Sequence, residues 1–379
     1  MSVQRETEAA PEDGVRVGVV GCGYWGPKHV RVACNLPSVS RVCVIDGRSD
    51  RLAMVRRSFP AVNCFSTLEE ALPEVDAVII ATPPSTHVAL ACEAIAAGKH
   101  VLVEKPLATS VADAELVVAA ADSACTVLMV GHTFEYNSAV WKLRELVNSG
   151  DLGELYYLDS ARLNLGLYQS DVDVIFDLAP HDVSIINYLL DSTPSSVQAW
   201  GATHAHQLTD VAYLRLDYED RAVSANVHIS WLDPCKVRRV TAVGSKKMAV
   251  YNDLASEERI RIHDKGVVTQ PTDELAHAPM SYRYGDIVSP YLAMDEPLSV
   301  QDEHFIECIL TGKRPQSDGR SGLSVVRVLE AARQSIETRR RVILLPEERP
   351  PLRQGIPMQL HPVIELGPEA DHRAPRRHA

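Results

Sequence analysis

The stretch Val15-Arg-Val-Gly-Val-Val-Gly-Cys-Gly-Tyr-Trp-Gly26 decides the fold of the first half of this chain. It begins with a Val-rich run that is typical of a buried strand, and Gly21, Gly23 and Gly26 follow at G-x-G-x-x-G spacing. Gly21 permits a tight turn, Gly23 lets a pyrophosphate approach the backbone, and Gly26 lets the next helix pack close to the sheet. That helix offers its N-terminal N–H groups to the phosphates, so the stretch predicts a dinucleotide site.

Asp46, at the end of the next predicted strand, indicates which dinucleotide binds. It lies 20 residues after Gly26, where a carboxylate accepts hydrogen bonds from the ribose hydroxyls of the adenosine. This carboxylate would repel a 2′-phosphate, which favours NAD over NADP as the cofactor. Arg48, two residues later, is the residue that could hold such a phosphate instead. A glycine turn that binds no ligand is the purely structural alternative.

The first part of the chain alternates short runs rich in Val and Ile with helix-length segments. Strands are expected at residues 15–20, 41–46, 76–81, 99–104 and 126–130, and helices at residues 87–97 and 110–121. Apolar strands that alternate with helices are typical of a parallel sheet covered on both faces. With right-handed crossovers this order predicts a doubly wound α/β Rossmann domain over residues 15–149.

The pattern changes after Ser149 and Gly150 to long segments in which apolar and polar residues alternate. Such segments are residues 155–165, 197–205, 211–218, 222–231 and 237–243, with helices expected at 178–190, 301–310 and 321–339. We therefore expect an α+β domain over residues 150–345, with a large, mainly antiparallel open sheet and two helices that close it. An open sheet leaves a face that another subunit typically covers, so a homo-oligomer, a tetramer or a dimer, is expected.

Both ends of the chain are expected to lie outside these domains. Residues 1–14 are polar and acidic, and we expect a disordered tail there. Residues 346–379 contain seven prolines, a density that cannot continue a helix or a central strand. This segment is either a disordered tail or an extended arm on a neighbouring subunit, since residues 356–366 keep several apolar side chains.

Length, charge and cysteine usage exclude several classes of protein. A chain of 379 residues with a net charge of −12 favours two domains and argues against a nucleic-acid partner. No run approaches the roughly 18 to 20 apolar residues of a membrane span, and no signal-peptide pattern opens the chain, so a cytoplasmic protein is expected. The eight cysteines are scattered singly without a C-x-x-C pair, which predicts reduced thiols and no metal site.

Two further patterns carry candidate chemistry. Glu104-Lys105-Pro106 follows a predicted parallel strand, at the edge where such sheets bind ligands, although Lys105 could equally be a solvated cap. Asp177 and His181 are four residues apart and share one face of a helix. An imidazole oriented by a carboxylate can move a proton, whereas a lone histidine is more often a packed core residue. Asp182 is expected to point elsewhere, as a solvated or first-turn carboxylate.

Together these residues resemble the glucose–fructose oxidoreductase/inositol dehydrogenase/MocA-like (Gfo/Idh/MocA) oxidoreductases over about residues 15–345. The matching motifs are Gly21–Gly26, Ala81-Thr82-Pro83-Pro-Ser-Thr-His87, Ala97–Leu107 with its Glu104-Lys105-Pro106, and Asp177-x-x-x-His181. Within that family, the runs Gly131–Asn137, Arg162–Gly166 and Phe176–His181 are similar to sugar 3-dehydrogenases. Those enzymes include ones that act on UDP-N-acetylglucosaminuronate and ones that prepare sugars for amination.

The resemblance implies a role for each motif residue. Lys105 would hydrogen-bond the carbinol oxygen, His181 would be the general acid/base, and Asp177 would contact its partner or a neighbouring hydroxyl. A neutral imidazole suits proton removal near pH 7, and a lysine cation stabilises a developing alkoxide. The family also suggests a cis peptide before Pro106. Its motifs place the cofactor beside Tyr24, Trp25, Thr82, Pro83, His87, Glu104 and Lys105, and the sugar beside Arg162, Asn164, Tyr168 and Asp177.

The substrate and the overall reaction stay open at this point. The segment Leu165–Asp171 has no basic residue, which weakens a nucleotide sugar and favours a neutral or cationic glycoside such as an aminoglycoside intermediate. Arg162, or an arginine of a neighbouring subunit, could still bind an anionic group. An NAD-dependent dehydrogenase acting at C3 of a pyranoside is favoured. An NAD-dependent glycosidase that oxidises C3 transiently is the alternative, and a non-enzymatic NAD(H)-sensing protein is disfavoured because Lys105, Asp177 and His181 occur together.

Overall fold

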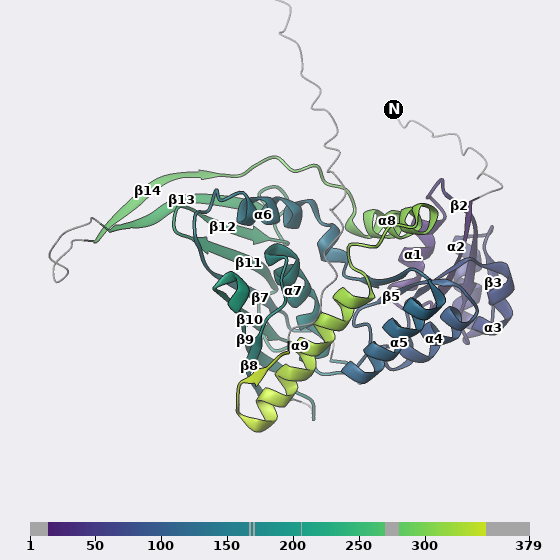
Figure 1. Ribbon diagram of the computed structural model, residues 1–379. Coiled ribbons are helices and arrows are strands. Elements are labelled where there is room, and N and C mark those ends of the chain that lie inside the picture. The colour runs from purple at the N-terminus through teal and green to yellow at the C-terminus, as the bar shows by residue number, and fades with distance from the viewer. Residues whose placement is uncertain (1–13, 167, 170, 206, 270–279, 346–379) are drawn as a thin grey trace, which may run out of the picture. The chain divides into compact units, whose positions relative to one another are not determined.

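A computed structural model describes residues 14–166, 168–169, 171–205, 207–269 and 280–345 of the chain (Figure 1). Both expected tails lie outside these residues, apart from Gly14.

The first domain is built on a six-stranded parallel sheet with the strand order β3-β2-β1-β4-β5-β6. The strands are β1 Val15–Val20, β2 Val39–Ile45, β3 Asn63–Phe65, β4 Ala77–Ile80, β5 His100–Glu104 and β6 Leu128–Gly131. Its helices are α1 Gly26–Ala33, α2 Ser49–Ser58, α3 Leu68–Ala71, α4 His87–Ala96 and α5 Val111–Ala124. The doubly wound Rossmann fold is therefore confirmed. Only β3 among the strands was not predicted, because three residues show no periodicity.

The second domain contains a nine-stranded sheet with the order β14-β13-β12-β11-β7-β10-β9-β8-β15. The strands are β7 Leu155–Leu163, β8 Ser196–Ala202, β9 Val211–Tyr218, β10 Val223–Ser230, β11 Val237–Gly244, β12 Met248–Asn252, β13 Ile260–Thr269, β14 Met280–Val288 and β15 Val342–Ile343. Only β7 and β10 pair in parallel, so the mainly antiparallel sheet is confirmed. Strands β12 to β15 were not predicted from the sequence; β13, for example, contains five charged, His or Gly residues in place of a regular alternation.

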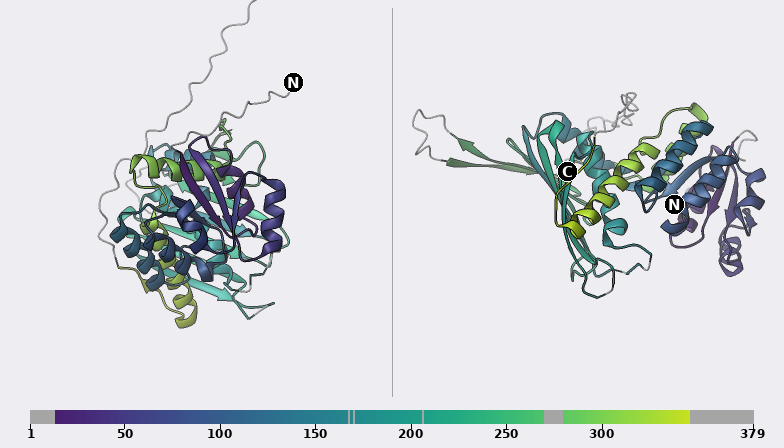
Figure 2. Two further views of the ribbon diagram at one scale, coloured as in Figure 1. Left: turned by 90° about the vertical axis from the view of Figure 1, so that its right-hand side faces the viewer. Right: turned by 60° about the horizontal axis from the view of Figure 1, so that its bottom comes forward.

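Helices cover one face of this large sheet (Figure 2). They are α6 Ser138–Asn148, α7 Val174–Leu190 and α9 Gly319–Thr338. Helix α7 begins four residues before the predicted start because Asp173 caps it, accepting a hydrogen bond of 3.0 Å from the Phe176 N–H. Helix α9 packs against α7 and β8 and also against α5, so it joins the two domains.

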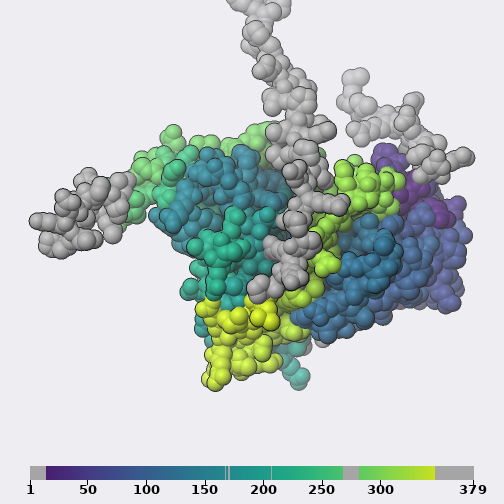
Figure 3. Space-filling model, in the orientation of Figure 1, coloured from purple at the N-terminus to yellow at the C-terminus, as the bar shows by residue number. Residues whose placement is uncertain are grey.

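Helix α8, Pro297–Thr311, does not lie where the sequence analysis placed it. Its Phe305 and Ile306 are buried in a cluster with Val17 and Val30 of the first domain, and α8 packs against α1 (Figures 1 and 3). The expectation that this helix closes the second domain is therefore wrong. The apolar face of a helix shows that it packs against something, but not which neighbour it meets.

The other face of the large sheet carries exposed aromatic side chains. Trp200 on β8 lies opposite Tyr213 on β9, with ring centroids 5.7 Å apart, and the Tyr213 ring stacks on His228 of β10 at 4.0 Å. Trp200 is 58% exposed and Tyr213 is 47% exposed. Among the described residues, no helix is both long enough and apolar enough to cross a bilayer.

Candidate active site

The turn after β1 has the geometry that a dinucleotide requires. Gly21 has φ of +93°, in the region that favours glycine, and its N–H donates to the Ile45 carbonyl at 2.8 Å. A Cβ on Gly26 would lie 1.8 Å from the Gly21 carbonyl oxygen, so only glycine lets α1 start this close to the strand. No atom lies within 4 Å of a Cβ built on Gly23, which leaves the backbone there open to a phosphate.

Asp46, which follows the neighbouring strand β2, binds the backbone of this turn. Its carboxylate accepts hydrogen bonds from the N–H of Cys22 at 2.7 Å and of Arg48 at 2.8 Å, and it is 8% exposed. The Arg48 guanidinium, the residue considered for a 2′-phosphate, pairs instead with Asp50 at 2.6 Å. The arrangement leaves Asp46 as the anionic group beside the turn and fits NAD.

Basic side chains gather around Tyr24 in the same turn. Tyr24 is 75% exposed, and the Lys28 ammonium lies 3.6 Å from its ring centroid and 4.2 Å from that of Trp25. The pKa of Tyr24 is lowered by a hydrogen bond and by the charge of Lys28, and further by Lys236 and Arg238. Lys236, in the connection between β10 and β11, and Arg238, at the start of β11, are therefore cations of the second domain that act on the glycine turn.

The loops after β4 and β5 are braced by His87. Its ring is buried, with Nδ1 2.8 Å from the Pro106 carbonyl and Nε2 2.9 Å from the Thr82 carbonyl. Burial lowers the pKa of His87, and a neutral imidazole donates to only one of these carbonyls at a time. His87 thus lies between the two loops, while Thr82 and Pro83 are at the loop surface. The peptide between Lys105 and Pro106 is cis, as the resemblance suggested.

Lys105 reaches from the end of β5 to helix α7. Its ammonium donates to the Asp177 carbonyl oxygen at 2.7 Å and to the Asp177 carboxylate at 3.3 Å. The second carboxylate oxygen of Asp177 accepts the indole N–H of Trp231 at 3.0 Å. The side chains of Lys105 and Asp177 are 14% and 18% exposed, so this contact between the domains is only partly open to solvent.

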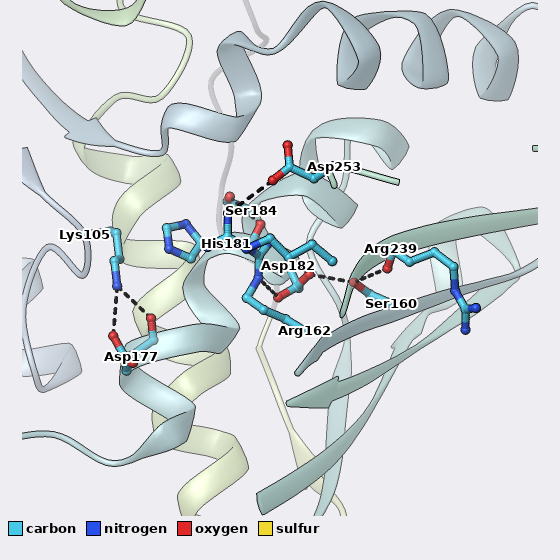
Figure 4. A network of polar contacts seen from close by, with 10 residues as sticks. Lys105, Ser160, Arg162, Asp177, His181, Asp182, Ser184, Arg239 and Asp253 are labelled. Carbon is cyan, nitrogen blue, oxygen red and sulfur yellow. Dashed lines mark hydrogen bonds and ion pairs between the residues drawn. The ribbon is translucent and has the colours of Figure 1, made fainter. Parts of the chain in front are cut away.

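His181 lies one turn after Asp177, and its ring points toward Lys105 (Figure 4). The Phe134 ring meets it edge-on, with centroids 5.0 Å apart. Burial, followed by the charges of Lys105, Arg162 and Arg238, lowers the pKa of His181 well below its ordinary value. The imidazole is therefore neutral at pH 7 and able to accept a proton.

Asp182, the next residue, corrects one expectation from the sequence. It is 1% exposed and not solvated, because α7 is buried on two sides and Asp182 faces the sheet. The Arg162 guanidinium donates to it at 2.7 and 3.3 Å, and the Ser160 hydroxyl donates at 2.6 Å (Figure 4). The guanidinium also lies 4.5 Å from the centroid of Phe134, which in turn contacts His181.

The other residues expected near a sugar lie around Trp231. Asn164 is exposed, and its N–H donates to the Ser230 carbonyl at 3.1 Å. The Tyr168 ring packs 5.1 Å from the Trp231 ring, so Tyr168 and Asp177 contact the same indole. Arg162 differs from these residues because its guanidinium is held by Asp182 and its side chain is 7% exposed.

Glu104 belongs to a buried ion cluster on the other side of Lys105. His29 of α1 contacts Glu104 through Nε2 at 3.1 Å and Asp302 of α8 through Nδ1 at 2.8 Å. Burial alone would lower the pKa of His29, but Asp302 and Glu104 together raise it to about 10. The imidazole is therefore a buried cation between two carboxylates.

His29, Trp231 and Asp302 were not noted from the sequence as residues of this region, and His132 and Phe134 were noted only as part of the run Gly131–Asn137. Only His132 and Phe134 carried a local signal, since they follow the end of a parallel strand as Lys105 does. No group of His, Cys, Asp and Glu side chains in the described segments could hold a metal ion.

The fold and the site together define a dinucleotide-dependent oxidoreductase with a Rossmann domain and a separate sheet domain. Residues 15–132 match the model "Oxidoreductase family, NAD-binding Rossmann fold", and residues 140–250 match the "GFO/IDH/MocA C-terminal domain". The chain belongs to the Gfo/Idh/MocA family, and NAD is its cofactor.

Individual relatives agree with this membership. UDP-N-acetylglucosamine 3-dehydrogenase of Acidithiobacillus ferrooxidans is 28% identical over 334 residues, 85% of this chain and 97% of that protein. A solved structure of that enzyme has a TM-score of 0.72. A putative oxidoreductase of Magnetospirillum magnetotacticum is 30% identical, with a TM-score of 0.72 over 84% of this chain and 99% of the other. GenD2 from gentamicin A biosynthesis, solved with NAD, shares the fold at 23% identity and a TM-score of 0.73, over 91% and 100% of the two chains.

Proposed function

We propose that this protein uses NAD to oxidise a secondary ring hydroxyl, at C3, of a pyranoside. The observation that carries the proposal is the contact between Lys105 at the end of β5 and Asp177 on α7, one turn before His181. It brings a cation from the cofactor domain beside a neutral base from the second domain. NAD, which the turn at Gly21–Gly26 and Asp46 would hold, would supply the hydride acceptor for the carbinol carbon.

The side chains supply what the oxidation needs besides the hydride acceptor. His181, neutral at pH 7, takes the hydroxyl proton, and the Lys105 ammonium hydrogen-bonds the oxygen as negative charge develops on it. Asp177 holds Lys105 in place, and its carboxylate, shared with Trp231, would accept a hydrogen bond from a neighbouring sugar hydroxyl. Phe134 fixes the ring plane of His181 by its edge-on contact.

We propose a nucleotide-linked amino sugar as the first substrate to test and an aminoglycoside intermediate as the second. The absence of basic side chains from residues 165–171, which disfavours a nucleotide sugar, concerns one segment only. In the folded chain, Lys28, Lys236 and Arg238 supply positive charge at the glycine turn. These charges lie beside the turn that takes the pyrophosphate of NAD, so the nucleotide sugar is proposed on the substrate type named for the Acidithiobacillus relative.

The test is a screen of NAD reduction against UDP-sugars, sugar phosphates and aminoglycosides, followed by Lys105→Ala and His181→Ala. Each variant is expected to keep NADH binding, followed by fluorescence, and to lose at least about 100-fold in kcat. Full turnover in either variant would contradict the proposed roles. Net NADH accumulation supports a dehydrogenase, whereas release of the aglycone without accumulation supports the glycosidase alternative.

We also propose that the exposed face of the large sheet pairs with a second copy of the chain. Trp200, Tyr213 and His228 form a row of contacting rings across three strands of that face. Light scattering should then give a dimer or tetramer, and Tyr213→Glu should shift the population toward the monomer. A monomer at micromolar concentration would contradict this pairing.

A further inference from the structure

His132 is a buried polar residue beside the site that the proposed reaction does not use. Strand β6 ends at Gly131, which pairs with Glu104 of β5, so His132 is level with Lys105 in the sheet. The side chain is 1% exposed. Within the part of the chain that the structure describes, neither Nδ1 nor Nε2 of His132 has a hydrogen-bond partner. A buried donor and acceptor without partners are costly, so an imidazole in this state requires an explanation, and a bound ligand is one.

The protein groups nearest to His132 along the chain and in the sheet are already engaged. Glu104 contacts His29 and accepts the N–H of Lys105, and the Thr133 hydroxyl donates to Gln301. Burial lowers the pKa of His132 to about 4, with Glu104 opposing and Lys105 adding to the shift, so the ring is neutral at pH 7. A neutral imidazole presents one N–H donor and one nitrogen acceptor.

The position of His132 in the sheet indicates which part of NAD it faces. In the order 3-2-1-4-5-6 a dinucleotide lies across the carboxyl edge, with one nucleotide on each half of the sheet. Asp46 on β2 marks the adenosine half, and the glycine turn after β1 marks the pyrophosphate. The nicotinamide half therefore falls to the ends of β4, β5 and β6, where Lys105 and His132 lie side by side.

We propose that His132 hydrogen-bonds the carboxamide of the nicotinamide ring and so fixes the ring beside Lys105. The carboxamide N–H can donate to the unprotonated nitrogen of a neutral imidazole, which gives one hydrogen bond between the cofactor ring and His132. Phe134, two residues further along, contacts His181, so one short segment after β6 touches the base and holds the cofactor ring. The inference rests on the NAD assignment and is independent of which sugar is oxidised.

The test measures cofactor binding, without any sugar, in the full chain. Fluorescence titration gives the dissociation constants of NADH and of an analogue, reduced 3-acetylpyridine adenine dinucleotide. In this analogue a methyl group replaces the amide nitrogen of the carboxamide. Wild type is expected to prefer NADH by about tenfold, as one lost hydrogen bond predicts, and His132→Ala should bind both cofactors equally and weakly. His132→Gln, which keeps a donor and an acceptor, should recover part of the preference.

The controls separate this contact from a merely structural role. His100→Gln changes a histidine at the opposite end of β5, and it should leave the NADH preference unchanged. Circular dichroism and the melting temperature establish that each variant is folded. If His132→Ala keeps the wild-type preference, or if His132→Ala and His132→Gln weaken both cofactors by the same factor, the proposal is overturned. Loss of sugar oxidation with this binding pattern intact would count against the proposed substrate and not against the His132 contact.

Discussion

Two buried ion clusters flank the proposed catalytic residues, and they differ in the cation that they contain. In the first domain, Glu104 directly precedes Lys105 and is held with Asp302 by His29. In the second domain, Asp182 directly follows His181 and is held by Arg162. Each cluster anchors a carboxylate one residue away from a proposed catalytic side chain.

Because the cations differ, only one of the two clusters can change its charge with pH. The His29 imidazolium can lose its proton, whereas an arginine in a protein stays charged. The first cluster also joins three elements, α1, β5 and α8, while the second joins β7 to α7. We therefore expect the first cluster to dominate stability and the second to dominate the placement of His181.

Replacing His29 by Leu should have the largest effect on stability. It leaves Glu104 and Asp302 buried without a cation, which costs about 3–5 kcal/mol when one partner of a buried ion pair is removed. Urea unfolding at pH 7 measures the loss. Asp50→Asn, which breaks the exposed pair with Arg48, is the matched control and should cause no measurable change. A loss for His29→Leu as small as that of the control would refute the comparison.

Replacing Asp182 by Asn should have the next largest effect, and it should appear in catalysis. Arg162 loses its ionic partner, and the Phe134 ring between that guanidinium and His181 is free to move. We expect kcat to fall roughly ten- to hundredfold, as misplacement of a reacting group predicts, with the NADH dissociation constant unchanged. A variant that loses stability but keeps its wild-type kcat would show that the cluster has no positioning role.

Of the two clusters, only the first should make the stability of the protein depend on pH between 6.5 and 10. The pKa of His29 is raised in the folded state, so its contribution is fully present below about pH 6.5 and is lost as the pH rises toward 10. The free energy of unfolding should therefore fall between pH 6.5 and 10 in wild type, and less steeply in Asp302→Asn. An equally steep fall in that variant would mean that other groups cause it.

The smallest expected effect is that of Phe134→Leu. The change removes an edge-on ring contact with His181 and a cation–π contact with Arg162, and both are modest interactions. We expect a loss of about 1 kcal/mol in unfolding free energy and a severalfold decrease in kcat. Leu143→Ala, which leaves a cavity in the core cluster that Phe134 packs against, is the control. It should lower the unfolding free energy more than Phe134→Leu does, and it should lower kcat less.

Sequence reasoning succeeded where a pattern is local. The glycine turn, the apolar strands of the first domain and the lysine at the end of β5 each depend on residues that are neighbours along the chain. The same holds for Asp177 and His181, which are one helical turn apart. It failed for Asp182, because a helix buried on two sides has no solvated face that its sequence could reveal.

Long-range pairs were out of reach for a physical reason. His29 and Asp302 are 273 residues apart, and nothing near either residue indicates the other. The neutral state of His181 likewise depends on burial by elements from both domains and on cations of β5, β7 and β11. The open face of the large sheet was predicted from the sequence, whereas strands β12 to β15 were not, because they lie outside the alternating segments that the sequence analysis recognised.

Helix α8 follows strand β14 of the second domain in sequence but packs against the first domain, and this affects folding during synthesis. The ribosome releases Glu104 and His29 long before Asp302, which lies 198 residues beyond Glu104. At about 5–20 residues per second, the first domain waits roughly 10–40 s for the segment that completes its buried charge cluster. Any chimera that exchanges the cofactor domain between relatives must therefore carry residues 297–311 with it, or the newly made domain will keep a charge that it cannot neutralise.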